Sequence, residues 1–260
     1  ADMLKCDTLN YLKDNYKNLK IAQWFLDPLI KDGPDYEKNK SRILDKIELT
    51  DANFITTSPD VLNFLPKKKL SLFMPNPVDS SFEVLNNYDN KECSMDVFFA
   101  LSHGVHRGIL KRGKYDERAD FVNRLVELTP NVKFDLYGIN NVQPIWADSF
   151  LKSISNAKMG VNLSRGNPIK YYSSDRITQL IGNGLLTFIH KDTMYNNFFS
   201  NKEVIFYSSL MDLSAKIQKY AQDDSMRRKI AKNGKEKYMK FFNSTIVADY
   251  IIKNTFNIEY

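Results

Sequence analysis

Residues 159–190 read MGVNLSRGNPIKYYSSDRITQLIGNGLLTFIH, and this stretch decides the fold. An apolar run at residues 159–163 is followed by a helical pattern at 174–183 and a second apolar run at 185–189. Within the helical pattern, Ile177, Leu180 and Ile181 fall on one side, as they do on a helix that covers a sheet. A strand, a helix and a strand in this order predict two parallel strands joined by a crossover helix.

The same alternation extends along the chain in both directions. Further strands are predicted from short apolar runs at residues 20–26, 53–57, 70–74, 96–101, 132–137 and 204–207. Helical patterns lie between most of these runs and after the last one, at residues 117–128, 212–221, 225–241 and 244–256. The sequence therefore predicts an α/β fold built on Rossmann-like parallel sheets.

A break in the pattern divides the chain in two. Pro75 and Pro77 open a polar stretch with few apolar residues, which is typical of an inter-domain connection. We expect an N-terminal Rossmann-like domain at residues 1–78, a linker at 79–94, a C-terminal domain at 95–242 and a C-terminal helix at 243–260. The first block holds only three predicted strands, so we expect it to be part of a larger domain.

Composition narrows the functional class. With 43% apolar residues, 17 Phe and 14 Tyr, the chain can build a sizeable core, which excludes disorder for its bulk. No apolar run reaches the roughly 18 residues of a membrane helix, and no secretion leader is visible. Cys6 and Cys93 suit neither a disulfide scaffold nor a zinc site, so a reducing cytoplasm is the expected compartment. The net charge of +6 favours an anionic partner.

In open parallel sheets, ligands bind at the carboxyl ends of the strands. After the run at 96–101 come Gly104, Arg107 and Lys111. Glycine lets a backbone approach a ligand, and arginine offers charge to a phosphate, so this is either an anion-binding loop or a solvated basic turn. Gly138 follows the run at 132–137, where it makes a turn and leaves room for a flat ring over the strand end.

The polar residues after the run at 159–163 are the most informative. Ser173 or Ser174 is a good N-cap for the next helix, whose N-terminus would attract a phosphate. The helix dipole disfavours Arg176 in the first turn unless the side chain shares an anion with the helix end. An ordinary capped helix with one polar face is the alternative. The candidate ligands in this stretch are Asn162, Ser164, Arg165, Ser173, Ser174, Arg176 and Gln179.

Several other chemistries lack their motifs. The chain has no D-x-D triplet, Walker loop, GxSxG elbow or GxGxxG loop, so transferases that hold a metal through such carboxylates are disfavoured. The basic run at residues 216–240 is either a solvated helix face or a contact with an anionic membrane surface. Nucleic-acid binding is not expected, because the aromatic residues lie in strand-like segments and are not interleaved with basic ones.

The order of motifs in the second block resembles a known family. The block contains DLYG at 135–138, VNLSRG at 161–166, SSDRITQLIGNGLLTFIH at 173–190, FFSNKEVIFYSSLMDLSAKI at 198–217 and SMRRKIAKNGKEKYMKFF at 225–242. This set resembles the C-terminal, donor-binding domain of GT-B glycosyltransferases, in particular the family-1-like group that includes CgeB-type proteins. The first block is similar to the later half of a GT-B N-terminal domain, through KIAQWFLDPL at 20–29, DANFITTSPDVL at 51–62 and LFMPNPVD at 72–79.

The resemblance implies transfer of a sugar from a nucleotide-diphosphate sugar to a glycan, lipid or protein acceptor, as in cell-envelope polysaccharide synthesis. It implies no cofactor and no bound metal, because cationic side chains and helix dipoles stabilise the departing diphosphate. It makes the first block the acceptor side and lets the C-terminal helix cross back to it. The donor-binding residues it implies are Gly104, Arg107, Lys111, Arg118, Gly138, Asn162, Ser164, Arg165, Ser173, Ser174, Arg176 and Gln179.

The chain also departs from the family pattern. The glutamates spaced eight apart in many retaining members would fall on Tyr171 and Gln179, neither of which is acidic. Retention and inversion therefore both stay open. Asp27 and Asp60 follow predicted strands, but a capping or turn role is the simpler interpretation, and no base is assigned. A non-catalytic nucleotide- or carbohydrate-binding module and a GT-B-fold nucleotide-sugar epimerase are the alternatives.

Overall fold

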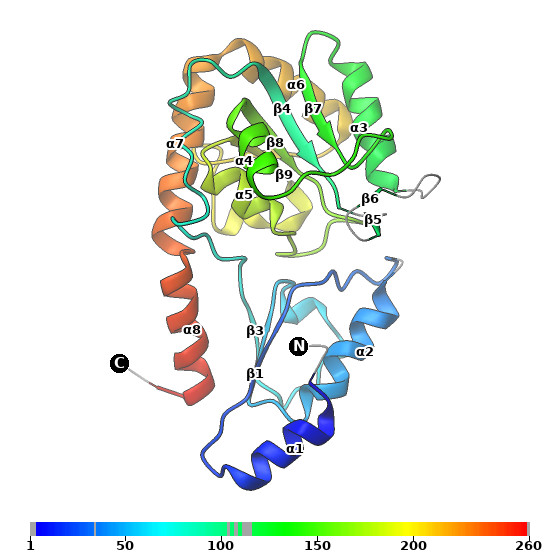
Figure 1. The fold of residues 1–260 in the computed structure, drawn as a ribbon, viewed down its shortest axis with the longest axis vertical. Helices are drawn as coiled ribbons and strands as arrows, with labels where there is room; N and C mark the ends of the chain where they lie inside the picture. The colour runs from blue at the N-terminus through cyan, green and yellow to red at the C-terminus, as the bar shows by residue number, and fades with distance from the viewer. Residues whose placement is uncertain (1–3, 34, 103–104, 107–108, 111–115, 259–260) are drawn as a thin grey trace.

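The computed structural model describes residues 4–33, 35–102, 105–106, 109–110 and 116–258. Two parallel sheets lie one above the other along the long axis of the molecule (Figure 1). The smaller, N-terminal sheet is formed before residue 75, and the larger sheet is formed after residue 94. All eight predicted strands are present, and two short antiparallel strands were not predicted: β5 (Val105–His106) and β6 (Ile109–Leu110).

The N-terminal sheet has three parallel strands in the order β1-β2-β3. Its strands and helices are β1 (Ala22–Phe25), β2 (Ala52–Ile55), β3 (Ser71–Phe73), α1 (Cys6–Asn15), α2 (Tyr36–Ile47) and the 3-10 turn η1 (Pro59–Val61). Successive side chains of β2 point to opposite faces of the sheet. Ile55 packs with Ile43 of α2 on one face, and Phe54 packs with Val247 of α8 on the other. Both faces are therefore covered, by helices from opposite ends of the chain.

The C-terminal sheet has five parallel strands in the order β10-β9-β8-β4-β7. The strands are β4 (Met95–Ala100), β7 (Phe134–Tyr137), β8 (Ala157–Asn162), β9 (Leu186–His190) and β10 (Ile205–Tyr207). Phe99 of β4, an interior strand of the sheet, packs with α3 and α6, and Phe98 packs with α4 and α5 on the opposite face. A strand buried on both faces reads as a continuous apolar run, which explains why the sequence located it.

The helices of the C-terminal part agree with the sequence patterns to different degrees. The helices are α3 (Glu117–Leu128), α4 (Ala147–Ser155), α5 (Arg176–Gly182), α6 (Leu210–Gln222), α7 (Asp224–Phe241) and α8 (Ser244–Phe256), with the 3-10 turns η2 (Lys191–Thr193) and η3 (Tyr195–Asn197). The bounds of α3 and α8 match the predicted ones, whereas α5 begins two residues later than predicted and α4 was not predicted. None of the described helices is long and apolar enough to cross a membrane.

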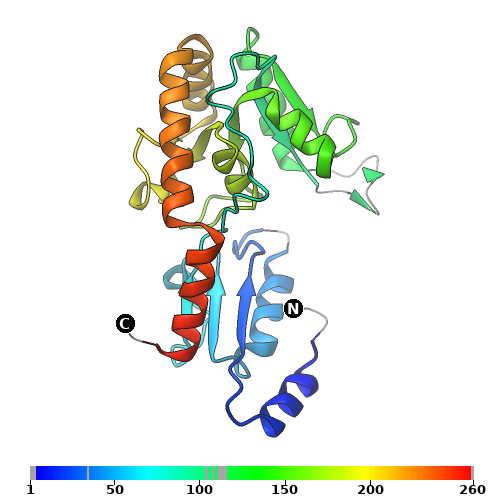
Figure 2. The same cartoon turned by 60° about the vertical axis from the view of Figure 1, so that its left-hand side comes forward.

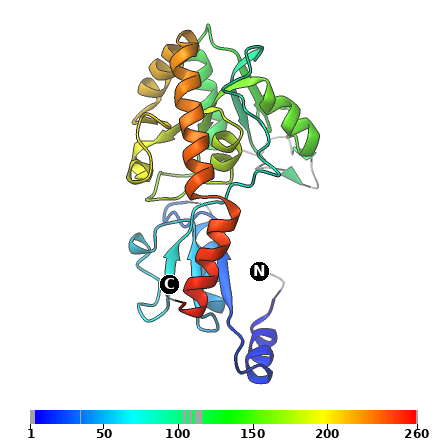
Figure 3. The same ribbon diagram turned by 90° about the vertical axis from the view of Figure 1, so that its left-hand side faces the viewer.

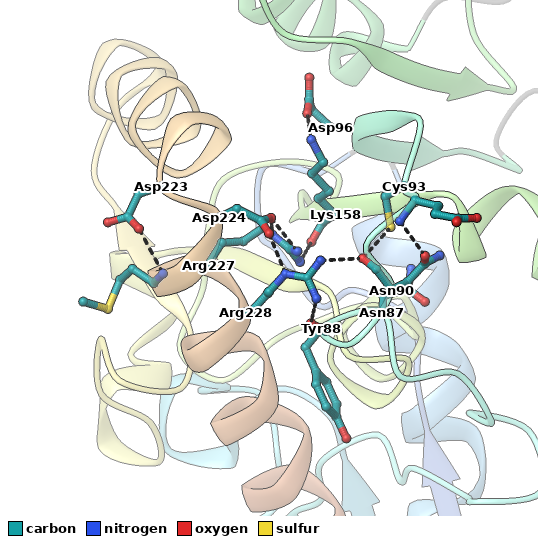
Figure 4. A network of polar contacts seen from close by, with 12 residues as sticks. Asn87, Tyr88, Asn90, Cys93, Asp96, Lys158, Asp223, Asp224, Arg227 and Arg228 are labelled. Carbon is teal, nitrogen blue, oxygen red and sulfur yellow. Dashed lines mark hydrogen bonds and ion pairs between the residues drawn. The ribbon is translucent and has the colours of Figure 1, made fainter.

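Residues 79–94 form no helix or strand, and they lie along the C-terminal part (Figure 4). Arg228 of α7 donates from its Nη1 to the Tyr88 carbonyl at 2.8 Å and from its Nη2 to the Asn90 carbonyl at 2.9 Å. The Asn87 amide donates to the Ala157 carbonyl at 2.8 Å, at the start of β8. Polar side chains thus hold this segment to the C-terminal part.

The chain crosses between the two parts twice, at neighbouring positions. Val78 donates to the Phe242 carbonyl at 2.9 Å and accepts from the Ser244 amide at 2.8 Å. Beyond this point α8 continues in line with α7 and runs beside the N-terminal sheet (Figures 2 and 3). The carboxyl ends of the two sheets face each other, since Ser58, after β2, donates from its backbone amide to the Lys170 carbonyl at 3.0 Å.

Candidate functional site

A cavity of about 700 Å³ opens at the carboxyl end of β4, and we call it the main cavity. Its walls are residues 100–102 at the end of β4, residues 145–151 between β7 and α4, and residues 174–183 in and around α5, with residues 81–84 at one side. The chain leaves β4 toward β7 on one side, and β8 then pairs with β4 on the other side. Open α/β sheets bind ligands where the strand order reverses in this way.

The Arg176 side chain lines the main cavity and is held by neutral acceptors. Its Nη1 donates to the Leu163 carbonyl at 2.8 Å and to Ser174 Oγ at 3.1 Å, and its Nη2 donates to the Ala100 carbonyl at 3.1 Å. The guanidinium also lies over the Phe99 ring, 4.9 Å from the centroid. Within the described part of the chain, no carboxylate lies at ion-pair distance from Arg176.

A second arginine, Arg118, lies close enough to affect Arg176. It is buried and forms a two-pronged pair with Asp116, from Nε at 2.9 Å and from Nη2 at 2.7 Å. Asp116 is also the N-cap of α3 and accepts from the Arg118 amide at 3.0 Å. Burial first, and then the charge of Arg118, lower the pKa of Arg176 to about 10. The arrangement concentrates positive charge, and an anion in the main cavity would relieve the repulsion.

The facing N-terminal part supplies carboxylates. Burial chiefly raises the pKa of Asp175, and the negative charge of Asp27 adds to that rise from across the boundary. Asp27 itself forms an ion pair with Arg42. Two further pairs join the parts directly: Asp35 to Arg165 at 2.5 Å, and Asp60 to Lys170. A capping or turn role was expected for Asp27 and Asp60; the structure pairs each of them with a cation, and Asp60 also lies in the 3-10 turn η1.

The structure separates ten of the twelve predicted donor residues into groups. Ser174, Arg176 and Gln179 line the main cavity. Asn162 and Ser164 line a separate, smaller cavity. Arg118 is bound to Asp116 and Arg165 to Asp35. Gly104, Arg107 and Lys111 lie outside the described residues.

The predicted serine N-cap of α5 is wrong. Asp175 occupies the N-cap position and makes no side-chain cap hydrogen bond. The Ser173 hydroxyl donates to the Ser174 carbonyl at 3.0 Å and lies 3.0 Å from the Asn162 amide nitrogen, while Ser174 Oγ accepts from Arg176. The Ser173 hydroxyl is therefore engaged by Asn162 of β8 and the Ser174 hydroxyl by Arg176, two residues further on, so neither hydroxyl caps the helix.

Gly138 has a local structural reason to be glycine. Its φ is +74°, and a Cβ here would lie 1.9 Å from the Leu101 carbonyl oxygen. The backbone after β4 thus occupies the space in which the sequence suggested room for a flat ring.

The two positions of the family's paired glutamates lie in different surroundings. Gln179 lines the main cavity. Tyr171 has a left-handed backbone with φ of +62° and packs against Phe73 and Phe198, each with its ring centroid 4.8 Å away. Its hydroxyl accepts from the Asn197 amide at 2.7 Å. Tyr171 therefore joins the two parts of the molecule.

Sequence reasoning missed one wall of the main cavity. Ile145 and Trp146 line it from the β7–α4 connection and Phe150 lines it from α4, and Trp146 is 48% exposed. Ala147 follows with φ of +49°, an uncommon conformation for a residue with a Cβ, and such strain is frequent at functional sites. The one clue in the sequence was a tryptophan shortly after a strand end. Across the described residues, no group of three or more His, Cys, Asp or Glu side chains is placed to hold a metal ion.

The profile of a family described as glycosyl transferase-like matches residues 117–253, more than half of the chain. The chain belongs to this family. The matched residues begin at α3 and include Arg176, Gln179 and the sheet from β7 to β10. No curated protein sequence matches this glycosyl transferase-like chain.

Solved glycosyltransferases share the fold of this glycosyl transferase-like chain. TarM is similar with a TM-score of 0.65 at 14% identity, over 94% of this chain and 51% of TarM. HepE from Anabaena, in complex with UDP and glucose, has a TM-score of 0.67 at 9% identity, over 97% of this chain and 76% of HepE. Sucrose-phosphate synthase from Thermosynechococcus elongatus has a TM-score of 0.62 at 12% identity, over 94% and 69%. The predicted GT-B-like α/β fold is confirmed, and the chain spans about half the length of TarM.

Proposed function

We propose that the main cavity binds a nucleotide-diphosphate sugar and that the whole protein transfers the sugar to an acceptor. Arg176 carries the proposal, because its guanidinium lines the main cavity at the switch point of the sheet and, within the described residues, donates its hydrogen bonds to two carbonyls and a hydroxyl. The complex of HepE with UDP and glucose supports the choice of anion, since the two chains share a fold.

In the proposed reaction, bond cleavage between the sugar and the diphosphate leaves negative charge on the diphosphate. Arg176 would stabilise that charge in the transition state. The sequence has no D-x-D triplet to hold a metal, so we assign this role to Arg176. Trp146 and Phe150, on the opposite wall, offer apolar surface to a nucleobase.

Replacement of Arg176 tests the assignment. We expect Arg176→Ala to weaken UDP binding at least tenfold, since a charge-assisted hydrogen bond contributes about 1.5–3 kcal/mol. Titration calorimetry with UDP, GDP and ADP would measure the loss and name the preferred base. Arg124→Ala, an exposed arginine on α3, is the matched control and should bind as the wild type does. An Arg176→Ala protein that is folded and binds every nucleotide normally would exclude the site.

One observation favours a second candidate, a non-catalytic nucleotide-binding module. Neither Tyr171 nor Gln179 is acidic, so the chain lacks both carboxylates of the retaining pattern. Incubation with UDP-sugars separates the two functions. Release of UDP, with or without an added acceptor, supports the enzyme, whereas tight UDP binding with no turnover by the full-length protein supports the module.

The sugar class and the acceptor belong to the same proposal. We take a hexose as the transferred group and a glycan, lipid or protein as the acceptor, as the family resemblance implies. Exposed Lys229 and Lys240 on α7 would suit contact with an anionic membrane that carries a lipid acceptor. Flotation with vesicles that contain anionic lipid would test that contact.

A further inference from the structure

A second cavity, of about 240 Å³, lies at the carboxyl ends of β8, β9 and β10. We call it the small cavity. Asn162 at the end of β8, His190 at the end of β9 and Tyr207 at the end of β10 line it, together with Phe121 of α3. None of the described residues around the small cavity also lines the main cavity.

Two nearly buried tyrosines line the small cavity with uncommitted hydroxyls. Tyr172 is 6% exposed and Tyr207 is 2% exposed. Neither hydroxyl has a hydrogen-bond partner among the described residues. Both hydroxyl oxygens are accessible to solvent. The Ser164 hydroxyl likewise has no hydrogen-bond partner among the described residues. These hydroxyls are therefore available to donate to and accept from a polar ligand in the small cavity.

The chemistry of the lining selects an uncharged occupant. No Asp, Glu, Lys or Arg is found among the described lining residues. His190 also lines the small cavity. Its Nδ1 accepts from the Asp192 amide at 3.2 Å, and burial lowers its pKa, so the ring is neutral at pH 7. A phosphate or carboxylate would therefore find no cationic side chain among the described lining residues, which makes its burial unfavourable.

The volume of the small cavity and the side chains that line it indicate more closely which class of ligand fits. A volume of about 240 Å³ corresponds to about eight water molecules of about 30 Å³ each, which accommodates one sugar ring but not a nucleotide. The rings of Phe121, Tyr172 and Tyr207 offer apolar surface to the C–H face of a sugar. Hydroxyl groups both donate and accept, so Ser164 and the two tyrosines match the hydroxyls of a sugar without a fixed pattern.

We propose that the small cavity is a second binding site, for a single uncharged sugar ring, separate from the main cavity. The two sites would communicate through Leu163, whose side chain lies in the small cavity wall and whose carbonyl accepts from Arg176 at 2.8 Å. Tyr172 lies on the same path, within electrostatic reach of Arg176. The proposal goes beyond donor binding and does not depend on it.

Saturation-transfer difference NMR with methyl glucoside, methyl galactoside and N-acetylglucosamine tests the site on the intact chain. We expect at least one of these sugars to bind at millimolar concentration, and glucuronate and glucose 6-phosphate to bind at least tenfold more weakly. Binding of phenol without any sugar, or no binding of any sugar, would overturn the proposal. Saturating UDP should leave sugar binding in place, and loss of sugar binding in UDP or UDP-glucose would show that the small cavity belongs to the donor site.

Tyr207→Phe locates the site, because it removes one hydroxyl and keeps the ring. We expect sugar affinity to fall about fivefold, the equivalent of one ordinary hydrogen bond. Tyr220→Phe is the matched control, since Tyr220 is buried in the same core cluster but lines neither cavity. Equal losses in both variants would contradict the assignment. UDP binding by Tyr207→Phe should be unchanged, so a failure of this site and a failure of the proposed donor site are distinguishable.

Discussion

The strand ends of the two sheets face each other and carry opposite charges. The segments after the N-terminal strands hold Asp27, Asp35 and Asp60, each in an ion pair with a cation. The segments after the C-terminal strands hold Arg118 and Arg176. Arg118 has a carboxylate partner, whereas Arg176 is held by carbonyls and a hydroxyl.

This difference separates structural charge from functional charge. A paired cation has its charge neutralised by the protein itself, and its removal should act on stability. A cation held by neutral acceptors keeps its full charge, so it attracts a mobile anion. Arg118 and Arg176 differ in this way although their charges influence each other.

The largest effect is expected for Arg118→Ala. Asp116 would stay buried without the two hydrogen bonds from this guanidinium, and breaking a buried pair costs about 3–5 kcal/mol of unfolding free energy. Urea denaturation would measure it. Arg124→Ala, on the exposed face of the same helix, should change stability by less than about 0.5 kcal/mol. If the Arg118→Ala protein has normal stability but cannot bind UDP, Arg118 is a ligand, and the distinction between structural and functional charge does not hold.

Arg176→Lys tests the difference between Arg118 and Arg176 further, because it keeps the positive charge of residue 176 and removes the planar guanidinium. Lysine cannot hold the Leu163 and Ala100 carbonyls in the geometry of a planar guanidinium. We therefore expect an intermediate loss of UDP affinity, about three- to tenfold, that grows with rising salt. Titration of wild type, Arg176→Lys and Arg176→Ala would measure the order. Equal affinity of the two variants would mean that charge contributes nothing at this position.

The ion pairs that join the N-terminal and C-terminal parts should each contribute little to the free energy of unfolding. Asp35→Asn removes the partner of Arg165, whose pair is partly exposed, so we expect a loss below about 1 kcal/mol of unfolding free energy. The loss should shrink in high salt, because such pairs are screened. Thermal unfolding in low and high salt would show both. Asp249→Asn, which breaks a pair within α8, is a control for a salt bridge that does not cross the boundary. A loss above 2 kcal/mol, on the order of a buried pair, would contradict the estimate for Asp35.

The smallest effect concerns Asp79, at the crossing between the two parts. Hydrogen bonds from the Ser244 hydroxyl first, and then from Ser81, lower the pKa of Asp79 to about 2 from its usual 3.8. Its contribution to stability is therefore present above pH 3.8 and is lost as the pH falls through about 2. An NMR titration would read the midpoint, and Ser244→Ala should raise it. A midpoint near 3.8 in the wild type would contradict the bond to Ser244.

Most of the fold could be predicted because its information is local. Buried parallel strands such as β4 and β8 appear as continuous apolar runs, and α3 and α8 show their apolar faces at helical spacing. The helix α4 escaped prediction, since it is short and follows an irregular connection. The cap of α5 was predicted wrongly, because the Asn162 contact that engages Ser173 comes from another element.

The sequence by itself determined the α/β class, the positions of the strands and the presence of polar residues after them, since these depend on burial and periodicity within short windows. Only the tertiary structure decided which of these residues share a cavity. Arg165 meets Asp35 of the N-terminal part, and Arg176 reaches the Ala100 carbonyl at the end of β4 from α5. Charge pairing depends on distance in space, and a chain that folds back on itself brings together partners that no local pattern can assign.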